Sequence, residues 1–249
     1  MSGQTGLTKK LIGVCLSTIH DEDRFKLICS LNRSAQENGY KLVIFNSCTD
    51  LYEQGNLNNV GEATVFRTIP YNLLSAMVMC SNFLFDKSVV RLVVDKCREN
   101  GVPVLSLDKD IDGCKEFSFT YADAFERLCR HIIKEHGAKR IFMMAGMKDN
   151  SFSQERVDAF RRTLEECGIP YDDSLVGYGG FWDGPTLDVV HTWFEIENRR
   201  IPDAIICAND TMAVAVSSYL QRQGYSVPGD CIVTGFDGIM QSEYHIPHL

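Results

Sequence analysis

Residues 202–213 read PDAIICANDTMA, and this stretch carries the local signals that decide the fold. The four apolar residues 204–207 have the length and composition of a buried strand. Asn209 then stands just before 211–223, which has helical spacing and is followed by Gly224. Asn209 and Asp210 are therefore candidates for a helix N-cap, for a ligand site at the end of a strand, or for both.

The same alternation of short apolar runs and longer amphipathic stretches continues in both directions along the chain, which is typical of βαβ units around a parallel sheet. Near-continuous hydrophobicity of the runs predicts that helices cover both sheet faces. The predicted strands are 11–16, 41–45, 76–80, 104–107, 140–144, 204–207 and 231–235. The predicted helices, each followed by a glycine that would serve the C-cap, are 25–38, 87–100, 122–136, 154–167 and 211–223.

The βα pattern runs about four times and then starts again near residue 119, so we predict an α/β protein with two Rossmann-like lobes. Residues 119–238 would form the C-terminal lobe. Residues 10–118, together with 239–249, would form an N-terminal lobe that is incomplete, with a hinge near 117–122. Residues 1–9 are polar, and we interpret them as a disordered lead-in or a tag.

Composition narrows the class of protein. The formal net charge of −8 disfavours contact with nucleic acid by this segment, and the most apolar stretch, 73–85, is too short and too polar to cross a membrane. The ten cysteines include no C-x-x-C pair and mostly lie in apolar runs, as Cys15, Cys80, Cys207 and Cys231 do. We interpret them as buried, reduced thiols, which predicts a cytoplasmic protein.

Polar residues follow the predicted strands at the end where open parallel sheets bind ligands. The segments are 17–23, 81–82, 108–110, 146–150, 209–210 and 235–237. Their amides, carboxylates and hydroxyls suit a polyhydroxylated ligand. Phe181 and Trp182 could add an aromatic face to such a site, although packing in the core explains them equally well.

Several motifs resemble one known family. They are PDAIICANDTMA (202–213), GY (224–225), VPGD (227–230), VTGFDG (233–238) and HGAKRI (136–141), with Ser153, Arg156 and Phe160 in the intervening helix. Together they resemble the effector-binding core of the lactose/galactose repressor (LacI/GalR) family, which shares the type I periplasmic-binding fold. The resemblance covers residues 10–249 and is closest from about residue 119 onward.

The resemblance implies two hinged lobes with parallel sheets flanked by helices and a ligand cleft between them. Arg156 would bind ligand hydroxyls bidentately, Asn209 and Asp237 would bind further hydroxyls, and the Phe181 ring would stack on the ligand. Asp108 and the loop after the first strand would contribute from the other lobe. The full set of predicted ligand-binding residues is Arg156, Asn209, Asp237, Phe181, Asp108, Ser17, Phe25, Ser153 and Trp182.

The function so implied is that of a non-enzymatic sensor in a bacterial transcriptional regulator. A small effector, either a carbohydrate or a nucleoside, would bind and close the lobes, without a cofactor, a metal or a membrane partner. A homodimer is expected, with DNA contacted only through a domain absent from this chain. Family members that repress genes carry an N-terminal helix-turn-helix, whereas here the first strand begins at Leu11, and they usually continue past the position of Leu249.

Two other functions stay open on the sequence. Residues 61–66 and 73–78 resemble sensor domains that precede GGDEF diguanylate cyclase domains, so the output could be a cyclic dinucleotide. An α/β enzyme with an unrecognised site is the other alternative, and it would turn its ligand over.

Other motifs are excluded by their context. Asp108, Asp110 and Asp112 match a calcium loop, but position twelve is Phe119 and a strand precedes the loop. No glycine-rich phosphate loop of the standard kinds occurs. His131 and His136 fall five residues apart on a predicted helix, and this spacing places them poorly to share a metal.

Overall fold

The computed structural model describes residues 10–249 except 50, 52–55, 81–83, 85 and 109. The predicted lead-in at 1–9 and the polar positions 81 and 82 therefore lie outside the described residues. The chain divides into two compact units, Met1–Phe119 and Thr120–Leu249, which we call unit 1 and unit 2. Each is an α/β unit with a parallel sheet, as the sequence predicts.

Unit 1 contains a parallel sheet whose strand order is β2-β1-β3-β4-β5. Its strands are β1 (Leu11–Ser17), β2 (Lys41–Ser47), β3 (Leu74–Met79), β4 (Val104–Leu107) and β5 (Lys115–Phe117). Its helices are α1 (Glu22–Glu37), α2 (Leu57–Glu62), α3 (Thr64–Arg67), the short 3-10 helix Tyr71–Leu73, and α4 (Lys87–Glu99). All five strands run in one direction, so their carboxyl ends lie along one edge of the sheet.

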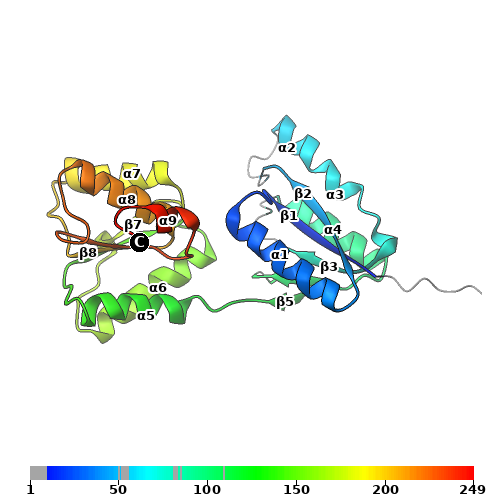
Figure 1. The fold of residues 1–249 in the computed structure, drawn as a ribbon, viewed down its shortest axis with the longest axis horizontal. Coiled ribbons are helices and arrows are strands. Elements are labelled where there is room, and N and C mark those ends of the chain that lie inside the picture. The colour runs from blue at the N-terminus through cyan, green and yellow to red at the C-terminus, as the bar shows by residue number, and fades with distance from the viewer. Residues whose placement is uncertain (1–9, 50, 52–55, 81–83, 85, 109) are drawn as a thin grey trace, which may run out of the picture. The chain divides into compact units, whose positions relative to one another are not determined.

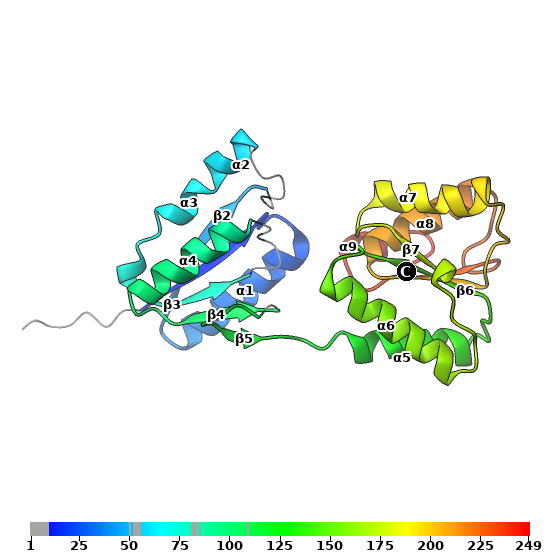
Figure 2. The same cartoon turned by 180° about the vertical axis from the view of Figure 1, so that it is seen from behind.

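Alternation along β1 assigns the helices of unit 1 to the two faces of its sheet. Val14 and Leu16 pack with Ile28 of α1, whereas Cys15, between them in the sequence, packs with Phe66 of α3 and the buried side of α4. Helix α1 therefore covers one face while α3 and α4 cover the other, which can be followed in Figures 1 and 2.

Unit 2 contains a second parallel sheet, of order β7-β6-β8-β9. Its strands are β6 (Ile141–Ala145), β7 (Val176–Tyr178), β8 (Ala204–Cys207) and β9 (Ile232–Thr234). Its helices are α5 (Ala122–Lys134), α6 (Ser151–Glu166), α7 (Asp183–His191), α8 (Asp210–Arg222) and α9 (Met240–Tyr244), with a 3-10 turn at Asp173–Leu175 and a π-helix at Thr192–Ile196.

The helices of unit 2 sandwich its sheet. Helices α5 and α6 pack against each other on one face, and α7 and α8 pack against each other on the opposite face (Figure 1). Strands β6 and β8 are buried at every position. This explains why their sequences show continuous hydrophobicity instead of alternation.

The seven predicted strands are all present, with ends that differ by at most two residues. Two further strands, β5 and β7, have only three residues each. The five predicted helices are confirmed, and the glycines predicted to end them all have positive φ: Gly39, Gly101, Gly137, Gly168 and Gly224.

Residues 239–249 differ from the prediction, because the structure places them in unit 2 and not with the N-terminal lobe. Helix α9 packs on α8, the Gln221 amide donates to the Ile246 carbonyl at 2.8 Å, and Leu249 packs on the core of unit 2. Ile239, just before α9, donates a hydrogen bond to Asp210 of α8. Residues 239–249 therefore stay beside strand β9, which they follow.

All ten cysteines are free thiols, and the four highlighted in the sequence, Cys15, Cys80, Cys207 and Cys231, are buried as predicted. Burial raises the pKa of the Cys80 and Cys231 thiols to about 12. They therefore act as small apolar residues. Among the described helices, none combines the length and the apolar character needed to span a bilayer.

Candidate functional site

The loops that follow the strands of unit 2 bring together side chains from distant parts of the sequence. Arg156 lies in the second turn of α6, which follows β6, and Asp237 lies in the loop after β9. The Nη2 atom of Arg156 is 3.9 Å from an Oδ atom of Asp237. Asn209 follows β8, the strand that lies between β6 and β9 in the sheet. These three predicted residues thus occupy one edge of one sheet.

Arg156 is the most buried charged residue of this group, with 7% of its side chain exposed. Its guanidinium carbon lies 5.3 Å from the ring centre of Tyr121 and 5.0 Å from that of Phe236, so two aromatic faces fix it in place. Burial lowers the pKa of the guanidinium, and the charge of Asp237 opposes that shift. Since an arginine side chain stays protonated in proteins, the site contains a desolvated positive charge.

The hydrogen bonds of Arg156 are incomplete. Its Nη1 donates to the Phe152 carbonyl at 3.3 Å, whereas its buried Nε has no hydrogen-bond partner among the described residues. The buried hydroxyl of Ser153, three residues earlier on the same helix, is likewise unpartnered in the described part of the chain. Buried polar groups are normally satisfied, so the Ser153 hydroxyl and the Arg156 Nε are candidates for contact with a ligand. A buried Nε without a partner among the described residues also occurs in Arg140 and Arg161, so this feature alone does not mark a site.

Asn209 caps helix α8, which confirms the structural half of its predicted role. Its Oδ1 accepts a hydrogen bond from the Met212 amide at 3.0 Å. Its Nδ2 donates to the Phe181 carbonyl at 3.1 Å, linking the loop after β8 to the loop after β7. The side chain therefore orients Phe181, in addition to any contact with a ligand.

Phe181 lies over the end of β6, with an unusual backbone conformation and a close contact between its ring and Gly146. Its backbone has a φ of +72°, in the left-handed region. A Cβ atom added to Gly146 would lie within 2.4 Å of three ring atoms of Phe181, so only glycine permits this approach. Trp182, the next residue, is 54% exposed at the start of α7 and is therefore no core residue.

Asp210, which the sequence suggested together with Asn209 as an N-cap, a ligand-binding residue or both, is buried and makes structural hydrogen bonds. It is 4% exposed, and its Oδ2 accepts hydrogen bonds from the Ile239 amide at 2.8 Å and the Ser242 hydroxyl at 3.0 Å. Its own amide donates to the Phe236 carbonyl at 3.0 Å. Asp210 thereby ties both ends of the loop that carries Asp237 to the start of α8.

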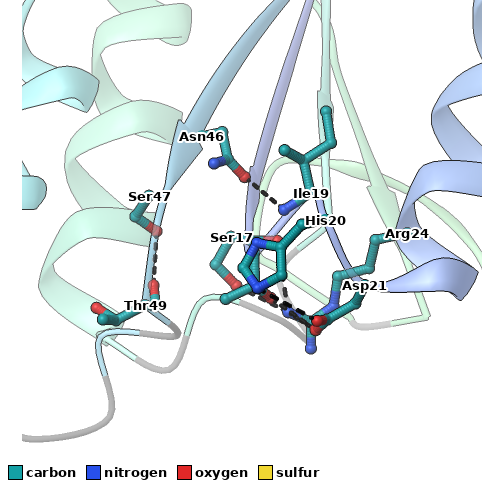
Figure 3. Close-up of polar contacts among 9 residues, drawn as sticks. Ser17, Ile19, His20, Asp21, Arg24, Asn46, Ser47 and Thr49 are labelled. Carbon is teal, nitrogen blue, oxygen red and sulfur yellow. Dashed lines mark hydrogen bonds and ion pairs between the residues drawn. The ribbon is translucent and has the colours of Figure 1, made fainter.

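A second polar cluster lies after β1 in unit 1, and Figure 3 shows it. The predicted residue Ser17 is fully buried, and its carbonyl and hydroxyl oxygens both accept from Arg24 Nη1 at 3.4 Å. Arg24 also pairs with Asp21 at 3.0 Å, and Asp21 accepts from the Thr18 hydroxyl at 2.9 Å. A nearly buried arginine thus organises the loop between β1 and α1.

Neighbouring strands complete this cluster of unit 1. Asn46, near the end of β2, accepts a hydrogen bond from the Ile19 amide at 2.9 Å (Figure 3). The Thr18 amide donates to the Ser47 carbonyl at 2.7 Å. Asp108, after β4, has a φ of +54°, and its carboxylate accepts from the Phe119 amide at 2.9 Å. The predicted residue Phe25 lies on α1 and is 57% exposed.

The residues that sequence reasoning missed are those whose role depends on burial. Arg24 lies just beyond the predicted segment 17–23, and its i,i+3 spacing from Asp21 was the available signal. Tyr121, at the start of α5, and Phe236, after β9, hold Arg156 from positions distant in sequence, so no local pattern indicates their pairing.

The structure corrects the predicted end of the helix that carries His131. Helix α5 ends at Lys134, and His136 returns toward the helix, so that the two Nε2 atoms lie 3.1 Å apart. Within the described residues, no group of three or more His, Cys, Asp or Glu side chains is placed to hold a metal ion.

Comparisons with known proteins agree with this architecture. Residues 131–249 match the periplasmic binding protein-like domain family. Over 244 residues the chain is 23% identical to the "HTH-type transcriptional repressor PurR" of Actinobacillus pleuropneumoniae serotype 3 (strain JL03). That alignment covers 97% of this chain and 68% of the repressor.

Solved structures show the same fold. A complex of the transcriptional regulator CelR with cellobiose has a TM-score of 0.76 at 19% identity, covering 96% of this chain and 71% of that one. The lac repressor dimer bound to operator and the anti-inducer ONPF has a TM-score of 0.74 at 20% identity, covering 98% of this chain and 80% of that one. At these identities the likeness establishes the fold.

Proposed function

We propose that this chain, which carries a periplasmic binding protein-like domain and has the fold of the LacI/GalR effector-binding core, is the ligand-sensing part of a transcriptional regulator. The ligand is a small polyhydroxylated molecule, a sugar or a nucleoside. It binds at the carboxyl edge of the unit 2 sheet. No covalent chemistry is required of the site, because recognition of such a ligand depends on hydrogen bonds and ring contacts.

The observation that carries the proposal is the state of Arg156. Two aromatic rings hold its guanidinium rigidly, while its Nε lacks a partner among the described residues and its Nη2 lies 3.9 Å from Asp237, which is too long for a hydrogen bond. A vicinal diol would supply acceptors to the guanidinium and donors to the carboxylate. A preorganised donor of this kind gains affinity because little side-chain entropy is lost on binding.

The surrounding side chains support a ring-shaped ligand. Gly146 and Asn209 hold Phe181, which also packs on the core of unit 2, and we propose that a ligand ring stacks on it, with the exposed Trp182 adjoining. The related fold of CelR was solved with cellobiose, a disaccharide, which suits a hydroxyl-rich ligand here. A nucleoside has the same combination of vicinal hydroxyls and a planar ring.

Signal transmission would follow from ligand contacts with both units. We propose that Phe25 and Asp108 of unit 1 contact the ligand and that the buried Ser17 contributes by holding Arg24, so that the ligand favours a closed arrangement of the units. A ligand shifts such an equilibrium only by its differential affinity for the two states. Small-angle scattering with and without effector tests this step, since superimposable profiles would remove it.

We propose that the output of the whole protein is control of transcription through DNA binding. The net charge of −8 disfavours the DNA backbone, so a separate domain would contact the operator. A homodimer would give that domain a symmetric partner, as in the lac repressor dimer bound to its operator. The site of action would be the cytoplasm, where transcription takes place.

The decisive experiment is a ligand panel of pentoses, hexoses, nucleosides and purines screened by thermal unfolding, with binding confirmed by calorimetry. A ligand at one hundred times its Kd should stabilise the folded protein by about 2.7 kcal/mol without being consumed. Arg156→Ala should abolish this shift. Arg161→Ala, on the same helix but 41% exposed and stacked on Tyr171, is the matched control and should retain it.

Two results would argue against the proposal. A ligand that stabilises the Arg156→Ala and wild-type proteins equally would place its site elsewhere. A ligand that disappears during the assay would favour an enzyme.

A further inference from the structure

The end of helix α5 brings together two histidines that lie away from the candidate effector site. Helix α5 spans Ala122–Lys134, and Glu135 is its C-cap. Gly137 then has a φ of +69°, and this left-handed residue reverses the chain. His136 is therefore no longer a helical residue, and its ring folds back toward His131 on the last turn.

The two imidazoles are in hydrogen-bond contact, and their separation is also that of two nitrogen ligands on one ion. Their Nε2 atoms are 3.1 Å apart, their ring centroids are 4.9 Å apart, and the ring planes are nearly perpendicular at 82°. Imidazole nitrogens bind zinc at about 2.0–2.1 Å, so two of them on one ion at tetrahedral or octahedral angles are separated by roughly 2.9–3.4 Å. The separation of 3.1 Å falls inside that window.

The surroundings also suit a cation. Both histidines are exposed, so water can fill the remaining coordination positions. The last carbonyls of the thirteen-residue helix α5 place partial negative charge at this end of the helix. Lys134 in the same turn carries the opposing charge, whereas the adjacent Glu135 offsets it.

We propose that His131 and His136 form a surface site for a borderline divalent cation, namely Ni²⁺, Cu²⁺ or Zn²⁺. These ions prefer imidazole nitrogen, whereas Mg²⁺ and Ca²⁺ prefer oxygen ligands. Since no third protein ligand stands among the described residues, the site is open, and exchangeable water completes it. Bound metal would join the end of α5 to the reversed chain at His136.

The test is calorimetric titration of NiCl₂, and separately ZnCl₂, into the full chain prepared without a histidine tag and with a non-chelating reductant. Wild type should bind one ion per chain. His131→Gln and His136→Gln should each weaken binding by at least about tenfold, because a single imidazole remains. His191→Gln, at the end of α7, is the matched control and should bind like wild type.

Two further measurements distinguish coordination by the two imidazoles from binding of the ion at another group. Binding should weaken at acid pH, because only neutral imidazole binds metal. In proton NMR spectra, substoichiometric Ni²⁺ should broaden two histidine signals, and both should be absent from the His131→Gln/His136→Gln double variant. Far-ultraviolet circular dichroism checks that each variant folds.

Specific results would overturn the proposal. If the double variant retains wild-type metal affinity, the ion is bound elsewhere, for example at the exposed thiols of Cys29 or Cys48. If wild type binds no metal more tightly than the double variant, the two rings share only a hydrogen bond. Effector binding is measured separately, so failure of the metal site leaves the proposed function intact.

Discussion

The carboxylate of Asp210 accepts a hydrogen bond from the Ser242 hydroxyl at 3.0 Å, and through it helix α8 holds the segment that follows strand β9. The same oxygen accepts from the Ile239 amide at 2.8 Å. Further along, the Ser217 hydroxyl lies 2.9 Å from His245 Nε2, and Gln221 binds the Ile246 carbonyl. Successive turns of α8 thus fasten residues 239–246, and the first of these contacts lies beside Asp237.

Replacement of Asp210 by alanine should destabilise the protein strongly. The Ile239 amide would lose its acceptor, and leaving a buried polar group unsatisfied costs about 1–3 kcal/mol, whereas the Ser242 hydroxyl can still donate to the Ile239 carbonyl at 2.6 Å. Urea unfolding followed by tryptophan fluorescence measures this loss. Ser242→Ala removes only one of the two hydrogen bonds and should therefore cost less. Equal stability of Asp210→Ala and wild type would show that the loop is held by other contacts.

Replacement of Gly146 by alanine should displace the Phe181 ring. The new methyl group would lie within 2.4 Å of three ring atoms, and overpacking of this kind costs about 1–3 kcal/mol. In the Phe181→Ala background the same change should cost much less, so a double-mutant cycle isolates the clash. Gly184→Ala, where no atom lies within 4 Å, is the control and should leave stability nearly unchanged. Additive costs in the cycle would contradict the close approach.

Replacement of Arg156 by methionine separates stability from ligand binding. The buried guanidinium has an Nε without a partner among the described residues and a long contact with a 44% exposed Asp237, so it contributes little to folding. Methionine can pack against the Tyr121 and Phe236 rings but loses the cation–π contacts, and we expect a ligand-free protein whose stability lies within about 1 kcal/mol of wild type. Urea unfolding provides the measurement. A large loss of stability would mean that the charge is structural rather than reserved for a ligand.

The sequence predicts the sheets well because buried strands carry their own signal. Strands β6 and β8 are apolar at nearly every position, since helices cover both their faces. Strand β5 has three exposed residues, and strand β7 has three residues around Gly177, so neither shows a hydrophobic run. Short edge strands are fixed by pairing with a neighbour, which local composition does not encode.

The candidate site is predictable only where a residue follows a strand. Arg156, Asn209 and Asp237 follow the ends of β6, β8 and β9, and a parallel sheet brings those ends to one edge. The rings of Tyr121 and Phe236 that hold Arg156 depend on tertiary packing. The contact between His131 and His136 was not predicted, because the predicted helix continued to His136, two residues past its end at Lys134. In a continuous helix the His136 ring would point away from His131.

The pH dependence of stability should include a contribution from His245. Burial lowers the pKa of this imidazole, whose Nε2 lies 2.9 Å from the Ser217 hydroxyl. The unfolded chain, in which a histidine titrates near pH 6.5, therefore binds more protons than the folded protein between the two pKa values. Stability is fully present above the unfolded value and decreases as the pH falls through that window. In His245→Gln this part of the decrease should be absent. Urea unfolding from about pH 7.5 to about pH 5.5 measures the slopes on either side of the unfolded value. Equal slopes for wild type and His245→Gln would show that the imidazole stays equally solvated in both states.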